Sequence, residues 1–323
     1  MRVVMVNEFG GPETLTVVER PEPRPGPADL VVRVEAVGVN FRDVMVRRGA
    51  YPGMPAPPLP VGVEGAGLVT EVGSDVTEFA VGDRVAWADV DGSYAETVKI
   101  PEASAVRVPA KVSAQQAAAV LAQGLTVHYL VTSVWPIAGG DSALVLSAAG
   151  GVGRLLTQAL TARGTRVLAV VSSETKATYA RSAGAERVLV GYDEIAAAAR
   201  DFTEGRGVDV VFDSVAGEGF PSSLASVRPR GCVVLYGASN GEPPLLDVRQ
   251  LGLSGSVFLT RPRLADFVTT RAEMLERSAE LFRWLADGVI DLHIGATYAL
   301  DAAGAAHKAL ESRATVGKLV LHP

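Results

Sequence analysis

The stretch ALVLSAAGGVGRLLTQALTARGTRVLAVVSS, residues 143–173, decides the fold class. It opens on an unbroken apolar run, 143–148, as expected for a central parallel strand that is covered on both faces. Apolar residues then recur every three or four positions as far as Gly164, which predicts an amphipathic helix. A second apolar run, 165–172, follows. This order of strand, glycine-rich turn, helix and strand predicts a βαβ unit with a right-handed crossover.

The same alternation continues downstream. A helix is expected over 174–184, and apolar strand patterns follow at 187–190, 208–215 and 231–238. Repeated βα units of this kind build a parallel sheet with helices on both faces. We therefore predict an α/β fold in which residues 123–263 form a Rossmann domain, that is, a doubly wound parallel sheet.

The residues on either side of that domain have a different pattern. Residues 1–122 are β-rich, with strands predicted at 30–40, 65–73 and 81–87 and proline-rich loops between them. The C-terminal part carries a long amphipathic helix, a short helix and a last strand. We predict that residues 1–122 and 264–323 together form a second, β-rich substrate domain.

Composition limits the classes of function. The chain has 323 residues, a net charge of −6, one cysteine and four histidines. The negative charge offers no basic surface for nucleic acid, and so few scattered ligands do not predict a structural zinc site. We expect Cys232 to be a small buried strand residue. The N-terminus is typical of a first strand rather than a signal peptide, and no stretch is expected to span a membrane. We therefore expect a cytoplasmic protein.

The turn inside the deciding stretch predicts a dinucleotide site. Ala148-Ala149-Gly150-Gly151-Val152-Gly153 lies between a buried strand and an amphipathic helix, the context of the dinucleotide-binding fingerprint. Glycines let the backbone approach a pyrophosphate, and the helix N-terminus offers free N–H groups and partial positive charge. Ala148 replaces the usual first glycine, so the prediction depends on the surrounding strand–turn–helix–strand order.

The end of the second strand predicts which nicotinamide cofactor binds. NAD sites usually place Asp or Glu there, on the ribose 2′-hydroxyl. This chain has Ser172-Ser173, and Lys176 follows one turn later with a cation that suits a 2′-phosphate. Tyr192, after the third strand, is a further candidate contact, whereas Glu174 is a mild counter-argument. We therefore predict NADPH rather than NADH.

These motifs together resemble a known family. The chain is similar to the quinone oxidoreductases, the zeta-crystallin-like branch of the zinc-free medium-chain dehydrogenases/reductases, over essentially its whole length. The resemblance is carried by GVNFRDVMVRRGAYP (38–52), VEGAGLVTEVG (63–73), QGLTVHYL (123–130), AAGGVG (148–153), VVFDSV (210–215), FLTRP (258–262) and ESRATVGKLVL (311–321). It implies a GroES-like substrate domain beside the Rossmann domain, and a cytoplasmic enzyme.

Departures from the zinc alcohol dehydrogenases imply that no metal is used. Where those enzymes carry Cys-His, this chain has Asn40-Phe41, and where they carry Gly-His-Glu it has Gly62-Val63-Glu64. The lobe that holds structural zinc is absent. Without a Lewis acid, the resemblance implies reduction of quinones or related α,β-unsaturated carbonyls by NADPH rather than oxidation of simple alcohols.

The resemblance also implies a set of cofactor-binding residues. Asn40 and Asp43, with Tyr51 beside them, would lie near the nicotinamide end. The others form a pyrophosphate turn, a 2′-phosphate corner and the lining of the cleft between adenosine and nicotinamide. Lys318 either reaches the cofactor or is solvated. In chain order the set is Asn40, Asp43, Tyr51, Gly150, Gly151, Val152, Ser172, Ser173, Lys176, Tyr192, Ser214, Tyr236, Gly237, Ser239, Phe258, Thr260 and Lys318.

No catalytic triad, carboxylate pair or activated cysteine is evident, and hydride transfer from a nicotinamide needs none. A hydrogen-bond donor near the acceptor oxygen helps. Tyr51 is the leading candidate because the matching tyrosine of the related enoyl-thioester reductases is a proposed proton donor; the alternative is that it only packs the pocket. Asn40, Thr126 and Gln123 are further candidate donors. His128 is expected to be a core residue.

The sequence leaves two alternative functions open and also predicts an oligomeric state. An enoyl-thioester or enone reductase would need basic residues at the mouth of its cleft, for which Arg42, Arg47 and Arg48 are candidates. A non-catalytic, crystallin-like NADPH-binding protein is the second alternative. The apolar segment 251–260 predicts an edge strand, and pairing it with its two-fold mate predicts a homodimer.

Overall fold

A computed structural model describes residues 1–323, and the chain forms two units. The parallel-sheet unit comprises Thr126–Phe267 and Arg283–Asp291, and the β-rich unit comprises Met1–Leu125, Val268–Phe282 and Leu292–Pro323. Each unit is described below by itself.

The parallel-sheet unit is built on six parallel strands in the order β11-β10-β9-β12-β13-β14. The chain starts in the middle of this sheet, runs to one edge and then returns to run to the other, as in a doubly wound fold. Every residue of β9 and β12 is buried, as predicted for central strands. The strands are β9 (Ser142–Leu146), β10 (Arg166–Val171), β11 (Arg187–Val190), β12 (Val208–Asp213), β13 (Val227–Leu235) and β14 (Phe258–Thr260).

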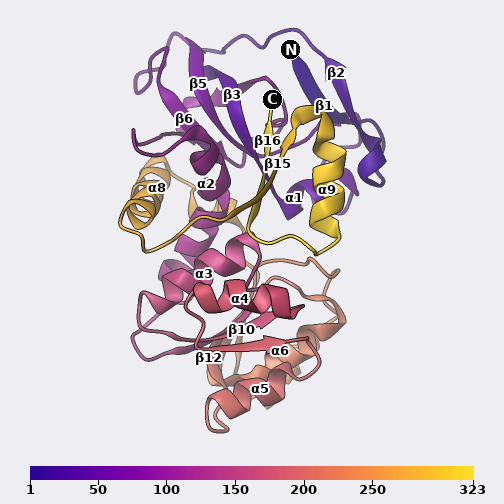
Figure 1. The fold of residues 1–323 in the computed structure, drawn as a ribbon, viewed down its shortest axis with the longest axis vertical. Helices are drawn as coiled ribbons and strands as arrows, with labels where there is room; N and C mark the ends of the chain where they lie inside the picture. Colours follow the sequence, from indigo (N-terminus) through magenta and orange to yellow (C-terminus); the bar gives the residue numbers. More distant parts are fainter. The chain divides into compact units, whose positions relative to one another are not determined.

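Helices cover both faces of this sheet. Figure 1 shows α3 and α4 on one face and α5 and α6 on the other. The apolar stripe of α3 packs on β9 and β10, since Leu155, Leu156, Ala159 and Leu160 are all buried. The helices are α3 (Gly151–Thr161), α4 (Glu174–Ser182), α5 (Ile195–Phe202), α6 (Phe220–Ser226) and α7 (Arg249–Leu253).

The β-rich unit holds two sheets. Six strands in the order β15-β16-β3-β5-β6-β8, with β7 also paired to β3, form the larger, and β2-β1-β4 form the smaller. The larger sheet is antiparallel except where β15 pairs with β16. The strands are β1 (Arg2–Val6), β2 (Leu15–Glu19), β3 (Asp29–Val39), β4 (Leu59–Pro60), β5 (Glu64–Val72), β6 (Arg84–Ala88), β7 (Thr97–Pro101), β8 (Ala105–Arg107), β15 (Ile294–Ala299) and β16 (Lys318–His322).

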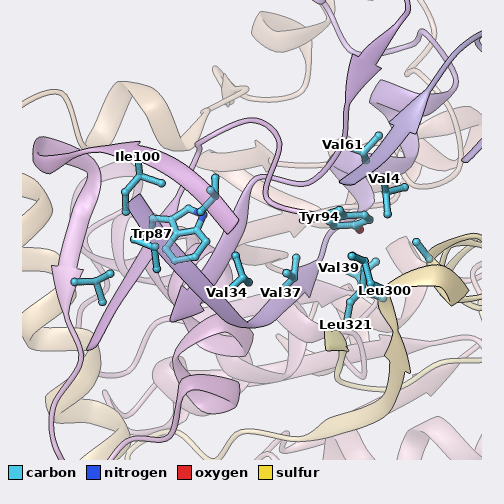
Figure 2. Packing of buried hydrophobic residues seen from close by; sticks show 14 of the residues in the cluster. Val4, Val34, Val37, Val39, Val61, Trp87, Tyr94, Ile100, Leu300 and Leu321 are labelled. Atoms are coloured by element: carbon cyan, nitrogen blue, oxygen red, sulfur yellow. The ribbon is translucent and has the colours of Figure 1, made fainter. Parts of the chain in front are cut away.

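One apolar core fills the β-rich unit. Figure 2 shows Trp87 and Ile100 at one end of this cluster and Tyr94 beside Val4 and Val61 at the other. The helices α1 (Phe41–Arg47) and α9 (Ala303–Glu311) belong to this unit. Most of α2 (Ala114–Tyr129) and of α8 (Arg271–Ala286) does too, but residues 126–129 and 283–286, and the π-helical turn that continues α2 to Val134, belong to the parallel-sheet unit. Short 3-10 turns occupy Pro12–Thr14, Glu102–Ser104, Gly217–Gly219, Leu264–Phe267 and Leu300–Ala302.

Three expectations need correction. The first correction concerns residues 264–323, all of which were expected in the β-rich domain. Residues 283–291 belong instead to the parallel-sheet unit. There the Trp284 ring stacks on His128 with centroids 5.2 Å apart, and Arg154 pairs with Asp291 at 2.9 Å. The boundary predicted at 122/123 lies at 125/126.

The second correction concerns the segment predicted as one strand over 251–260. Its first part belongs to α7, and β14 contains only Phe258–Thr260. Gly255 and Ser256 have φ of +98° and +58°, a left-handed turn that no continuous strand allows.

The third correction concerns membrane-spanning potential, which was expected nowhere in the chain. One helix, Ala114–Val134, has the length and mean hydropathy of a span, with a value of 1.4. However, 67% of that stretch is buried inside the protein. A mostly buried apolar helix is typical of a protein core.

Candidate functional site

The turn between β9 and α3 has the backbone of a phosphate-binding loop. Gly150 is the N-cap of α3, so the first N–H groups of an 11-residue helix face out of this turn. A Cβ atom on Gly153 would lie 2.3 Å from the backbone oxygen of Ser147, so only glycine lets the helix approach the strand this closely. Gly150, Gly151 and Val152 are therefore where the sequence predicted a pyrophosphate contact.

The predicted cofactor residues of the parallel-sheet unit share one edge of its sheet. Most come within a few residues after the carboxyl end of a strand, whereas Phe258 opens the three-residue strand β14, and the strand order reverses between β9 and β12. Ligands of open α/β sheets bind at this edge, beside such a switch point. The residues are Gly150, Gly151 and Val152 after β9, Ser172, Ser173 and Lys176 after β10, Tyr192 after β11, Ser214 after β12, Tyr236, Gly237 and Ser239 after β13, and Phe258 and Thr260 in β14.

The corner after β10 carries a cation and two hydroxyls. Ser172 is exposed, and the Lys176 ammonium lies 3.2 Å from its hydroxyl oxygen. The Ser173 hydroxyl caps α4 by accepting the Lys176 backbone N–H at 3.4 Å. No carboxylate ends β10 itself. This corner can therefore hold a phosphate group at the N-terminus of α4.

The residues after β12 and β13 form a tightly packed pair of turns. A Cβ atom on Gly237 would lie 2.8 Å from the backbone oxygen of Ser214, and the Ser239 N–H donates to that same oxygen at 3.1 Å. The Tyr236 hydroxyl is buried without a hydrogen-bond partner, and burial raises the pKa of Tyr236. Phe258 is 60% exposed, so it is not the core residue that was the alternative expectation.

In the β-rich unit, Asn40 belongs to a buried polar cluster. The Lys318 ammonium donates to Glu64 Oε2 at 2.6 Å and to Asn40 Oδ1 at 2.8 Å. Asn40 Nδ2 donates to Glu64 Oε2 at 2.9 Å and to the Gly38 backbone oxygen at 3.3 Å. Lys318 is 1% exposed and Glu64 is fully buried. Lys318 is therefore not a solvated lysine.

A second buried network starts at Asp43. Its Oδ2 accepts the Asn40 backbone N–H at 2.8 Å and the Tyr94 hydroxyl at 3.0 Å, and the same hydroxyl lies 3.1 Å from His307 Nε2. Asp43 is fully buried, and its Oδ1 has no partner. Figure 2 shows the Tyr94 ring inside the apolar core. Asp43 thus lies in the core of its unit rather than at a surface where it could face a ligand.

Burial sets the ionisation of this network. It raises the pKa of Asp43 from 3.8 to about 6, because the charged carboxylate loses its water while one of its oxygens gains no donor. Burial, followed by repulsion from Arg47, lowers the pKa of His307 from 6.5 to about 3. His307 is consequently neutral at neutral pH.

The raised pKa of Asp43 predicts how an isosteric variant behaves. The folded protein keeps a proton on Asp43 that the unfolded chain releases above pH 3.8, so this contribution to stability is present below pH 3.8 and is lost as pH rises through 6. Asparagine cannot ionise. The free energy of unfolding of Asp43→Asn, relative to wild type, should therefore rise by about 2 kcal/mol from pH 4 to pH 7.

Urea unfolding at pH 4, 5.5 and 7 measures that difference. Comparing the two proteins at each pH removes the contribution of His307, which both share. A difference that stays constant, or that falls toward pH 7, would show that Asp43 ionises in the folded protein as readily as in the unfolded chain.

Tyr51 lies in a turn after α1, beside Arg42. The Arg42 guanidinium carbon is 4.6 Å from the centre of the Tyr51 ring, a cation–π contact. Arg42 also pairs with Asp91 at 3.2 Å and with Asp89 at 3.7 Å. Tyr51 is half-buried, and Arg42 contacts both its ring and its hydroxyl.

The remaining candidate donors lie on α2. Thr126 and Gln123 are half-buried, and Gln123 Oε1 is buried without a hydrogen-bond partner. His128, one turn further on, is 4% exposed and stacks on Trp284, as expected for a core histidine. Cys232 is buried in β13, also as expected.

No group of three or more His, Cys, Asp and Glu side chains is arranged to hold a metal ion. At the positions where zinc enzymes place ligands, Asn40 and Glu64 contact the Lys318 ammonium, and Val63 is a core residue. The family resemblance implied that Glu64 has no metal to bind, and in the structure Glu64 contacts the Lys318 ammonium.

Sequence reasoning missed both buried networks. Glu64 and Lys318 are 254 residues apart, and Tyr94 and His307 are 213 residues apart, so no local pattern joins them. One signal was available, because Lys318 opens the apolar strand KLVLH, where a lysine needs a buried acid as its partner.

Two family models match the chain. The alcohol dehydrogenase GroES-like domain matches residues 26–110, and the model named zinc-binding dehydrogenase matches residues 151–286. A GroES-like domain joined to a doubly wound dinucleotide-binding domain is the composition of the medium-chain dehydrogenases/reductases, and this chain has both parts.

Full-length relatives narrow that class. The quinone oxidoreductase of Pseudomonas aeruginosa is 39% identical over 319 residues, which cover 98% of this chain and 97% of the relative. The 2-haloacrylate reductase of a Burkholderia species is 35% identical over 99% of this chain and 98% of its own. The crystal structure of Escherichia coli quinone oxidoreductase complexed with NADPH matches with a TM-score of 0.97, 37% identity and full coverage of both chains. The chain belongs to the quinone oxidoreductase family.

Proposed function

We propose that this protein is an NADPH-dependent quinone oxidoreductase, which reduces quinones or related α,β-unsaturated carbonyls without a metal. The observation that carries the proposal is the carboxyl edge of the parallel sheet, where a phosphate-binding turn and the Ser172–Lys176 corner adjoin neighbouring strands. Relatives of the same family crystallised with NADPH support the choice of cofactor.

The residues at this edge fit the cofactor. The N-terminus of α3 and the close approach at Gly153 suit a pyrophosphate, while Lys176 and Ser172 suit a 2′-phosphate. The partnerless hydroxyl of Tyr236 is a buried donor available to a ligand at the same edge. When bound, NADPH would supply the hydride. Other predicted cofactor contacts, including Thr260 and Ser214, lie at the same edge of the parallel sheet.

The protein's own contribution is to hold the acceptor and to stabilise charge on its oxygen. Tyr51 is the donor that we propose for this oxygen, since the residue is only half-buried and its ring is held by Arg42. The structure argues against Asn40 as a donor, because both of its amide hydrogens are already engaged. Thr126 remains a candidate donor.

An enone or enoyl-thioester reductase is the second candidate function, favoured by the 2-haloacrylate reductase among the relatives. A small enone fits the proposal with little change. A bulky acyl carrier fits less well, because the three arginines expected at the mouth of the substrate cleft already have carboxylate partners. Arg42 pairs with Asp91, and both Arg47 and Arg48 pair with Glu311 at 2.5 Å.

The acceptor class is tested with purified protein and NADPH in the presence of a strong chelator. We expect 1,4-benzoquinone to have a higher kcat/KM than a 2-enoyl thioester. A higher value for the thioester would favour the second candidate. Tight NADPH binding with no turnover of any acceptor would instead indicate a non-catalytic NADPH-binding protein.

We further propose a cytoplasmic homodimer that forms through β14. This strand is last in the sheet order, with no strand of its own chain on the outer side. Nearby apolar side chains are exposed: Leu253 by 87%, Val248 by 73% and Phe258 by 60%. An open edge beside exposed apolar groups favours pairing with a second copy.

Lysines at this edge should dissociate the dimer. The double variant Leu253→Lys, Phe258→Lys adds two charges to the proposed interface and should behave as a 33.6 kDa monomer in light scattering, whereas wild type should have twice that mass. Val81→Lys is the control, since Val81 is 62% exposed in the other unit. A monomeric wild type, or a dimer unaffected by the double change, rules out this interface.

A further inference from the structure

The Asn40 cluster has three features that cofactor binding does not explain. A lysine ammonium and a glutamate carboxylate, each almost fully buried, lie 2.6 Å apart. The glutamate has no further role in the proposed chemistry. Both side chains touch the amide of Asn40.

The pair fixes the orientation of that amide. A lysine ammonium has only donors, so the atom of Asn40 that faces it must be the carbonyl oxygen. A carboxylate has only acceptors, so the atom that faces Glu64 must be the amide nitrogen. A flipped amide would place two donors together and two acceptors together. The two charges therefore select one of two orientations that have nearly the same shape.

The surrounding backbone holds the pair in place. The second oxygen of Glu64 accepts the backbone N–H of Ala122 in α2 at 2.6 Å. A Cβ atom on Gly38 would lie 2.4 Å from Glu64 Oε2 and 2.8 Å from Lys318 Cε, so glycine makes the space that the pair occupies. Strands β3, β5 and β16 and helix α2 thus converge on one buried ion pair.

We propose that Lys318 and Glu64 are positioning residues that present Asn40 to the bound ligand as a hydrogen-bond acceptor. The amide hydrogens are used within the cluster, whereas the carbonyl oxygen accepts from Lys318. An amide oxygen has two lone pairs, so it can also accept an N–H or O–H group of the ligand. This inference rests on the proposed function and on the nicotinamide-end position that the family resemblance implies for Asn40.

The test removes both charges together. Glu64→Gln or Lys318→Met alone leaves an uncompensated buried charge and should lower Tm strongly. The double variant restores charge balance, so it should fold with a Tm close to that of wild type, but the two charges no longer select the Asn40 orientation and only the 3.3 Å hydrogen bond to the Gly38 backbone oxygen favours it. We expect its kcat with 1,4-benzoquinone to fall at least fivefold while its Kd for NADPH changes less than threefold.

Two comparisons separate positioning from loss of stability. The double variant Arg47→Met, Glu311→Gln removes another ion pair of the same unit, with Arg47 fully buried, and should keep the kcat of wild type. Adding Asn40→Ala to the Glu64, Lys318 double variant should lower kcat no further, because the interaction that it removes is already lost. An unchanged kcat in the Glu64, Lys318 double variant, or a full additional loss from Asn40→Ala, overturns the proposal.

A readout without activity comes from the side-chain amides. The chain has three asparagines, so selective ¹⁵N labelling gives three resolvable amide groups: Asn7, Asn40 and Asn240. The Asn40 amide hydrogens should exchange at least tenfold more slowly than those of exposed Asn7, and the Glu64, Lys318 double variant should lose this protection. Protection that survives in the double variant overturns the inference, whereas a wild type that reduces no quinone rejects the proposed function alone.

Discussion

Gly153→Val is expected to weaken NADPH binding by about 100-fold. The Cβ atom would lie 2.3 Å from the backbone oxygen of Ser147 and 2.9 Å from Ala148 Cα, and neither backbone atom can move without shifting β9 or α3. Overpacking of this kind costs about 1–3 kcal/mol of folding stability. We expect α3 and the turn to move apart to relieve it, which takes the N–H groups of the turn away from the pyrophosphate; a 100-fold loss in affinity corresponds to about 2.7 kcal/mol. Fluorescence titration of purified protein with NADPH measures the loss.

Gly252→Val is the matched control for this prediction. Gly252 lies in α7 of the same unit, and a Cβ atom there meets nothing within 4 Å. This variant should bind NADPH as wild type does. If Gly153→Val binds within threefold of wild type and has the same far-ultraviolet circular dichroism, the turn after β9 does not form the pyrophosphate site.

Lys176→Ala is expected to weaken NADPH binding by roughly ten- to 100-fold and to leave NADH binding unchanged. The ammonium lies beside Ser172 at the end of β10, where the 2′-phosphate would be held. A hydrogen bond to a charged group contributes about 1.5–3 kcal/mol, and NADH has no phosphate to lose. Titrations with both cofactors give the ratio directly.

Arg181→Ala is the control, because it removes an exposed cation from the last turn of the same helix, α4. It should change neither affinity. The converse variant Ser172→Asp should favour NADH, since a carboxylate there repels a 2′-phosphate and can accept from a 2′-hydroxyl. Equal losses of both cofactors in Lys176→Ala would place the 2′-phosphate elsewhere.

Much of the parallel-sheet unit was predictable from sequence because its signals are local. An apolar run, a glycine-rich turn and a helical stripe follow one another within 143–173, and the structure has β9, α3 and β10 there. The strand–turn–helix order also predicted the phosphate-binding turn, whereas the wider set of cofactor residues came from the family resemblance. The prediction of one continuous strand over 251–260 was wrong, because apolar composition alone does not reveal the left-handed turn at Gly255 and Ser256.

The β-rich unit was harder to predict because its polar groups meet across long separations. Asp43 was expected near the nicotinamide, yet it accepts the hydroxyl of Tyr94 in the core. Lys318 was expected to be solvated or to reach the cofactor, yet it is buried against Glu64. In both cases burial decides the role of the charged group, and burial depends on residues that lie far away in the sequence.

The central claim is that this chain reduces quinones with NADPH and without a metal. Its most direct test is the initial rate of NADPH oxidation by 1,4-benzoquinone, at catalytic protein concentration and in strong chelator, with the uncatalysed rate subtracted. We expect steady turnover that the chelator does not reduce and a kcat/KM for NADPH at least tenfold above that for NADH. No turnover, equal use of both cofactors, or activity lost to chelation and restored by zinc would contradict the claim.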